Sequence, residues 1–181
     1  MTSILKVDTL QDANGTGSPY IKDAVLQVKQ GVLRTNWSGD DSQAWQDTPL
    51  SVTITPKSTS SNILITAMIS YSLGDGSHGG FKVVRNDTDF LLTTETLGSR
   101  VAAHTHSQMA SAYDTDYQIQ NATINLLDSP SSTSALVYKL QARTASSNTY
   151  RIYLNHLGFR TEDQNYQAYC ISTITAMEIG G

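Results

Sequence analysis

Apolar and polar residues alternate with a period of two along most of the chain. Between Leu50 and Ile54 every second residue is apolar, and Pro56 ends the run. No apolar series with the helical period of 3.6 residues continues for three turns, so the pattern predicts strands rather than helices. The expected strands are residues 50–55, 63–71, 81–85, 90–92, 117–127, 135–143, 150–155 and 170–179.

Segments rich in Gly, Pro, Ser, Asn and Asp separate these strands. Many short strands joined by such turns at intervals of about 8–12 residues are typical of β-sandwiches and barrels. We therefore predict an all-β fold, an antiparallel β-sandwich, for residues 23–181. The expected turns and loops are residues 56–62, 74–80, 86–89, 99–111, 128–134 and 145–148.

Some of the expected strands are apolar or small on both faces, namely residues 63–71, 135–138 and much of 171–179. An antiparallel sheet normally packs one face on the core and exposes the other to water, with polar residues there. A strand that is apolar on both faces needs a second cover, and the simplest cover is another copy of the same chain. The pattern therefore predicts a homo-oligomer.

Residues 1–22 differ from the rest, because they contain one short strand-like piece followed by a loop. A lone strand cannot bury its own apolar side chains. We expect this segment to be an attachment arm that docks on a partner protein through Ile4, Leu5, Val7 and Leu10. It lacks the basic and apolar regions of a signal peptide, and no window of the chain approaches the roughly 20 apolar residues of a membrane helix.

Charge and cysteine content exclude several classes of function. The formal net charge is −4 and the basic residues are scattered, so we expect no nucleic-acid binding. The one cysteine, Cys170, cannot form an internal disulfide or a four-thiolate metal site, which favours assembly in a reducing cytoplasm. We expect no cofactor.

The candidate metal ligands are His104 and His106. On a strand both imidazoles would project to one face, and around a threefold axis such pairs could converge on a metal ion. The alternative is that both histidines face solvent. Catalytic motifs such as a nucleophile elbow, a zinc-protease helix or a phosphate-binding loop do not occur. We therefore expect a binding or structural protein and not an enzyme.

Aromatic residues offer a binding surface. Tyr and Trp rings stack on sugars and anchor protein interfaces while they keep a polar group for water. Several tyrosines fall in or beside loops, and the alternative is that they belong to the core or to contacts between subunits. The expected binding residues are His78, Tyr113, Tyr117, Tyr166 and Tyr169.

Passages along most of the chain also carry a family resemblance. They include residues 3–10 (SILKVDTL), 50–56 (LSVTITP), 60–65 (SSNILI), 133–141 (TSALVYKLQ) and 172–179 (STITAMEI). In this order they resemble small virion proteins of marine and freshwater bacteriophages, including cyanophages. The resemblance implies a homotrimeric jelly roll similar to tumour necrosis factor and complement-type globular heads. The chain departs from long fibres because it has no coiled-coil or β-helical shaft.

The function that this resemblance implies is that of a short tail fibre or receptor-binding knob. The arm would dock on phage tail proteins, and loops at the far end would contact a host surface glycan or protein. The alternative is a trimeric decoration (cement) protein on the capsid, and a third class is an enzyme that degrades host polysaccharide. We expect the protein on the virion surface, at the tail or the capsid, after assembly in the host cytoplasm, with no membrane insertion.

Overall fold

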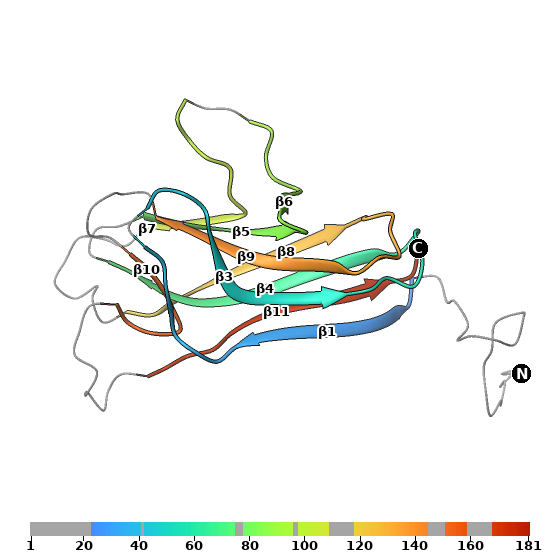
Figure 1. Ribbon diagram of the computed structural model, residues 1–181, viewed down its shortest axis with the longest axis horizontal. Helices are drawn as coiled ribbons and strands as arrows, with labels where there is room; N and C mark the ends of the chain where they lie inside the picture. The colour runs from blue at the N-terminus through green and yellow to red at the C-terminus, as the bar shows by residue number, and fades with distance from the viewer. Residues whose placement is uncertain are drawn as a thin grey trace, which may run out of the picture.

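The computed structural model consists of two antiparallel sheets packed face to face, with no helix in the part of the chain that it describes (Figure 1). This arrangement confirms the all-β, sandwich-like fold expected from the alternating pattern. The described residues are 23–40, 42–74, 78–95, 98–108, 118–144, 151–158 and 168–181. No helix in these ranges is long and apolar enough to span a membrane.

Sheet A has the strand order β1–β11–β4–β8. Strand β10 continues the line of β11 along the same edge of β4 and pairs with β2 on its other side. The bounds of these strands are β1 Val25–Leu33, β2 Trp37–Ser38, β4 Asn62–Leu73, β8 Gln120–Asp128, β10 Ile152–Leu154 and β11 Ser172–Ile179.

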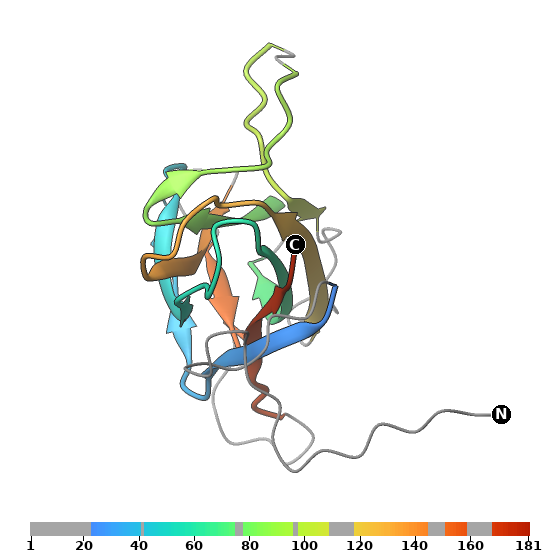
Figure 2. The same ribbon diagram turned by 90° about the vertical axis from the view of Figure 1, so that its right-hand side faces the viewer.

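Sheet B has the order β3–β9–β5, and the short strands β6 and β7 pair with different parts of the outer edge of β5. Its strands are β3 Gln46–Ile54, β5 His78–Arg85, β6 Thr88–Asp89, β7 Thr105–Gln108 and β9 Leu136–Thr144. Between β6 and β7 the chain leaves the sheet and stands away from the sandwich (Figure 2).

The hydrophobic core lies between the sheets and is built from every second residue of each strand. Strand β4 contributes Ile63, Ile65 and Ile69, all fully buried, and β9 contributes Tyr138 and Leu140, also fully buried. Burying an aliphatic side chain of this size contributes about 1.5–3 kcal/mol. The period-two pattern of the sequence thus becomes the inner face of each sheet.

The two sheets approach closely where β1 lies against β3. A Cβ atom on Gly31 would lie 1.9 Å from the carbonyl oxygen of Ser51, so only a residue without a side chain allows this spacing. A glycine in a strand interior commonly marks such a close backbone approach. Gly31 therefore closes one edge of the sandwich.

A partly buried ion pair links the sheets near the other edge. Nη1 of Arg85 on β5 donates to both carboxylate oxygens of Asp128 on β8, each at 2.7 Å, and the Tyr138 hydroxyl donates to the same carboxylate at 2.7 Å. Burial and this contact with Asp128 raise the pKa of Tyr138. The carboxylate is satisfied by three hydrogen bonds, as a buried charge requires.

The strand predictions agree with the structure in the central segments and differ at several places. Strand β1 was not among the expected strands, and β5 begins at His78, inside the expected loop 74–80. Residues 90–92 are not a strand, because the chain leaves the sheet after β6. Residues 99–111 were expected to be a loop, yet Thr105–Gln108 forms β7 against β5. The expected turn after β5 is confirmed, since Asn86 and Asp87 both have positive φ angles, as a tight hairpin turn needs.

The chain enters and leaves the sandwich at one end. The backbone N–H of Asp23 donates to the carbonyl of Gly180 at 2.8 Å, next to the C-terminus. The start of β5 at His78, and β10, lie at the opposite end (Figure 1). Residues 1–22, the expected arm with Ile4, Leu5, Val7 and Leu10, lie outside the described residues.

Candidate functional site

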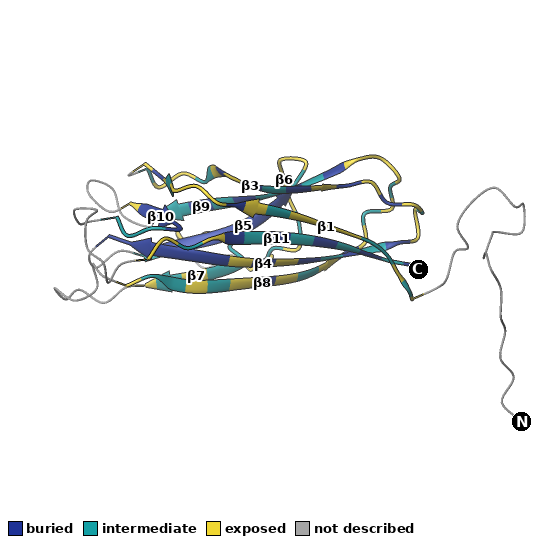
Figure 3. Ribbon diagram, turned by 90° about the horizontal axis from the view of Figure 1, so that it is seen from below, coloured by how far each residue is buried: buried dark blue, intermediate teal, exposed yellow. Residues whose placement is uncertain are grey.

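The outer face of sheet A carries apolar side chains in rows that cross the strands. Val28 pairs with Met177, Met177 with Leu64, and Leu64 with Leu127, which gives one apolar row over four strands. Val28 and Leu127 are 50% and 53% exposed at the two ends of this row. Figure 3 shows β8, β4, β11 and β1 side by side, with exposed positions along them.

A second row lies four residues further along the strands and a polar row separates the two. The second row contains Val32 and Met68, which are 37% and 42% exposed, joined through Thr173. The row between consists of uncharged residues, namely Gln30, Thr175, Thr66 and Asn125. We call the two apolar rows and the row between them the sheet A face.

The sheet A face contains no charged residue, whereas the outer face of sheet B is covered with ion pairs. There the ammonium group of Lys139 contacts carboxylates of Asp47 and Asp87, each at 2.7 Å, and Lys82 pairs with Asp89. The hydrogen bonds from Lys139 and Gln141 hold the pKa of Asp47 below its usual value. The outer face of sheet B is therefore suited to contact with water, whereas the uncharged sheet A face is suited to contact with another protein surface.

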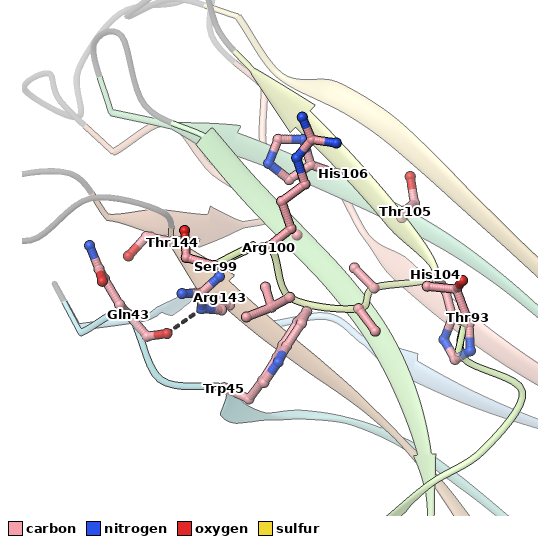
Figure 4. A pocket seen from close by; sticks show the side chains of 14 residues that line it. Gln43, Trp45, Thr93, Ser99, Arg100, His104, Thr105, His106, Arg143 and Thr144 are labelled. Atoms are coloured by element: carbon pink, nitrogen blue, oxygen red, sulfur yellow. Dashed lines mark hydrogen bonds between the residues drawn. The ribbon is translucent and has the colours of Figure 1, made fainter. Parts of the chain in front are cut away.

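A pocket lies on the outer face of sheet B, under the segment that connects β6 to β7 (Figure 4). Its volume is about 800 Å³, within the range of about 300–1,000 Å³ that is usual for small-molecule sites. We call it the Trp45 pocket. It is lined by Gln43, Trp45, Gly80, Thr93, residues 99–106, Arg143 and Thr144.

Trp45 lines the pocket next to the bare backbone of Gly80. The Lys82 ammonium lies 4.8 Å from the centre of the Trp45 ring, a cation–π contact that holds the indole in place. A Cβ atom on Gly80 would be only 3.4 Å from the Trp45 ring and 3.6 Å from Ala103. The absence of a side chain at Gly80 thus keeps this part of the pocket open.

Three basic side chains surround the same space. Nε of Arg143 donates to the backbone carbonyl of Gln43, which fixes the direction of the guanidinium group. Arg100 and His106 line the pocket from the opposite segment. Burial and the nearby charges of His78 and Arg143 lower the pKa of His106, so its surroundings are already electropositive.

Of the two candidate metal ligands, His104 is held by the backbone. Its Nδ1 accepts a hydrogen bond from the Val83 N–H at 3.0 Å, and its Nε2 lies 3.2 Å from the carbonyl of Phe90. Since Nδ1 accepts, the proton is on Nε2, and a metal ion would have to displace one of these contacts. His104 is half-buried rather than facing solvent, while His106 is exposed.

The nearest described aromatic neighbour of the His106 ring is the imidazole of His78. The two ring centres are 5.8 Å apart across the β5–β7 pairing. Among the described residues, no group of three or more His, Cys, Asp or Glu side chains is placed to hold a metal ion. The threefold-axis metal site stays a prediction, since it would draw on more than one chain.

The expected binding residues fall into two groups. His78 is the first residue of β5, Tyr169 lies three residues before the start of β11, and Tyr169 is 69% exposed. Tyr113, Tyr117 and Tyr166 lie outside the described residues.

The sequence did not predict the Trp45 pocket, although it singled out His106 as a candidate metal ligand. The lining comes from the segment before β3, from β5, β7 and β9, and from the β6–β7 connection, and several of these are far apart along the chain. Only the pairing of β9 with β5 brings Arg143 opposite Gly80. A sequence signal for the site would have required the strand order in advance.

No protein-family model matches this chain, and no curated protein matches it in sequence.

Proposed function

We propose that this chain is the homotrimeric head of a bacteriophage virion protein, a short tail fibre that docks by residues 1–22 and contacts the host surface with the far end of its sandwich. The resemblance of its strand passages to small phage virion proteins supports the viral assignment. In this proposal the protein binds and assembles, and it does not catalyse a reaction. The strand order, the sheet A face and the position of the chain ends also support it.

The strand order supports a jelly roll. The described residues form eight strands of four or more residues. If these are numbered 1 to 8 in chain order, the strand order is 1–8–3–6 in sheet A and 2–7–4–5 in sheet B. A jelly roll places eight strands in two sheets through two Greek keys, and successive strands mostly change sheet. This is the architecture that the family resemblance implies.

The sheet A face is the observation that carries the proposal. One of its rows joins the exposed Val28 and Leu127 through the half-buried Met177 and Leu64, and no charged residue interrupts the rows. The cores of subunit interfaces are depleted in charged residues and more apolar than the remaining surface. A second and third copy of the chain would cover this face without desolvating any charge.

The two ends of the sandwich suit two different contacts. Asp23, the first residue after the arm, is hydrogen-bonded to Gly180 at the end where the C-terminus lies. The starts of β5 and β11, next to which His78 and Tyr169 lie in the sequence, are at the opposite end (Figure 1). An arm that docks at one end would leave the other end pointing outward, where a host-binding surface belongs.

Adhesion of the purified, full-length protein tests the proposal. Labelled protein should bind cells of the bacterial host and compete with infection by the parent phage, with avidity from its three copies. Absence of both effects would contradict it. Copy number in purified particles separates the alternative, because hundreds of copies indicate capsid decoration and a few dozen at most indicate a fibre.

A further inference from the structure

We propose that the Trp45 pocket binds an anionic saccharide, a sugar that carries a carboxylate or a phosphate group. This inference rests on the proposed function, since it assigns a ligand to a host-binding head. It places a binding site on the outer face of sheet B.

The charges of the pocket select an anion. The guanidinium groups of Arg143 and Arg100 line it beside the imidazole of His106, and no Asp or Glu is among the described residues that line it. This local excess of positive charge occurs in a chain whose net charge is −4. Neither arginine forms an ion pair with an acidic residue of the described part of the chain.

The geometry of Arg143 suits a planar or tetrahedral oxyanion. Its Nε is taken by the carbonyl of Gln43, while its terminal nitrogens have no hydrogen-bond partner among the described residues. A guanidinium group fixed in this way can offer a forked pair of donors to carboxylate or phosphate oxygens. The side chain is therefore oriented before a ligand arrives, which lowers the entropic cost of binding.

The remaining lining suits a sugar ring. Trp45 supplies an indole held by Lys82, and the open position at Gly80 leaves room beside it. Aromatic rings stack on the apolar faces of sugars. Hydroxyl groups of Thr93 and Ser99 line the same space and can donate to or accept from sugar hydroxyls.

The surroundings of the pocket limit the ligand to a short anion. The same sheet face carries the carboxylates of Asp47, Asp87 and Asp89, each paired with a lysine. A long polyanion such as a nucleic acid would need a continuous basic surface, and these carboxylates interrupt it. A volume of about 800 Å³ accommodates a short oligosaccharide.

Titration calorimetry with the full-length protein tests this proposal. The probes are oligogalacturonate and sialyllactose for carboxylates, mannose 6-phosphate for phosphates, and maltotriose as the neutral sugar. We expect at least one anionic sugar to bind and maltotriose to bind at least tenfold more weakly. Binding by the carboxylated or by the phosphorylated probes identifies the anionic group. If no anionic probe binds, or if maltotriose binds as tightly as the anionic probes, the proposal is overturned.

Variants locate the binding. Arg143→Gln should weaken the anionic probe at least tenfold, and Arg100→Gln should weaken it as well. Arg34→Gln is the matched control, because Arg34 is an exposed arginine outside the pocket. If Arg143→Gln and Arg34→Gln bind the anionic probe with equal affinity, the assignment of the binding site to the Trp45 pocket is contradicted. Unchanged circular dichroism of each variant shows that the fold is retained, and a misfolded Arg143→Gln is replaced by Arg143→Lys with the same expectation.

The same variants separate this inference from the proposed function. If the unmodified protein adheres to host cells and Arg143→Gln adheres equally well, the pocket assignment fails while the host-binding head stands. If the unmodified protein does not adhere, the proposed function fails, and the calorimetry still decides whether the pocket binds an anionic sugar.

Discussion

The Ser172 hydroxyl donates a hydrogen bond of 2.7 Å to the Asn155 side-chain oxygen, and both residues are fully buried. The Asn155 amide donates to the carbonyls of Leu33 and Thr35, and the Ser70 N–H donates to the Ser172 oxygen. This polar cluster ties β1, β4 and β11 to the turn after β10. Asn155 has a φ of 68°, which asparagine tolerates better than most residues.

We predict that Ser172→Ala destabilises the protein by about 1–3 kcal/mol, because it leaves the Asn155 oxygen and the Ser70 N–H buried without their partner. Urea unfolding followed by circular dichroism measures the change. The control is Thr53→Ala on the exposed face of β3, which should shift the unfolding free energy by less than about 0.5 kcal/mol. Equal stability of the two variants would show that the cluster contributes nothing.

Acid should weaken the fold partly through Glu178. Burial alone raises its pKa, but hydrogen bonds from the Gln27 side chain and the Lys57 N–H, both 2.6 Å, outweigh burial and hold the pKa below the usual value. A carboxyl whose pKa is lower in the folded than in the unfolded state stabilises the protein above its unfolded pKa. That contribution is lost as the pH falls below about 5 and through the folded pKa.

Glu178→Gln tests this pH dependence. The variant should be less stable at pH 7 by about 1–3 kcal/mol, since the new amide group faces a donor. Its unfolding free energy should then fall less steeply with acid than that of the unmodified protein. Denaturant titrations at several pH values between neutrality and acid measure both curves, and parallel curves would contradict the role of Glu178.

Two glycines on different strands should respond oppositely to a methyl group. Gly31→Ala places a Cβ 1.9 Å from the Ser51 oxygen, so β1 and β3 must separate, and we expect a loss of about 1–3 kcal/mol. Gly80→Ala meets only ordinary contacts at 3.4 Å and removes backbone entropy from the unfolded chain. We expect Gly80→Ala to leave the midpoint of thermal unfolding unchanged or to raise it. A Gly31→Ala variant with a higher midpoint than Gly80→Ala would contradict the geometry.

The sequence predicted the elements whose pattern is local and missed what depends on pairing. Alternation over residues 63–71 correctly separates the inner residue Ile65 from the outer residue Met68. The short strand β7 lacks apolar alternation, because its pairing with β5 is set by the backbone and not by a core face. For the same reason His104 was expected in solvent or on a metal, although two backbone groups hold its ring.

The Trp45 pocket illustrates the same limit for the site. Trp45, Arg100 and Arg143 have no common spacing in the sequence, and the fold of sheet B and the β6–β7 connection bring them together. The sheet A face was partly predictable, since residues apolar on both sides of a strand indicate a second cover. The absence of charge over the whole face became visible only once the register of four strands was known.

Sedimentation velocity of the full-length protein at micromolar concentration is the most direct test that the sheet A face joins copies of this chain. We predict that the unmodified protein sediments as three chains of 19.7 kDa, that Leu127→Glu shifts it toward a single folded chain, and that Thr53→Glu, on the opposite sheet, sediments like the unmodified protein. A single chain at every concentration for the unmodified protein, or an unchanged trimer for Leu127→Glu, would contradict the account.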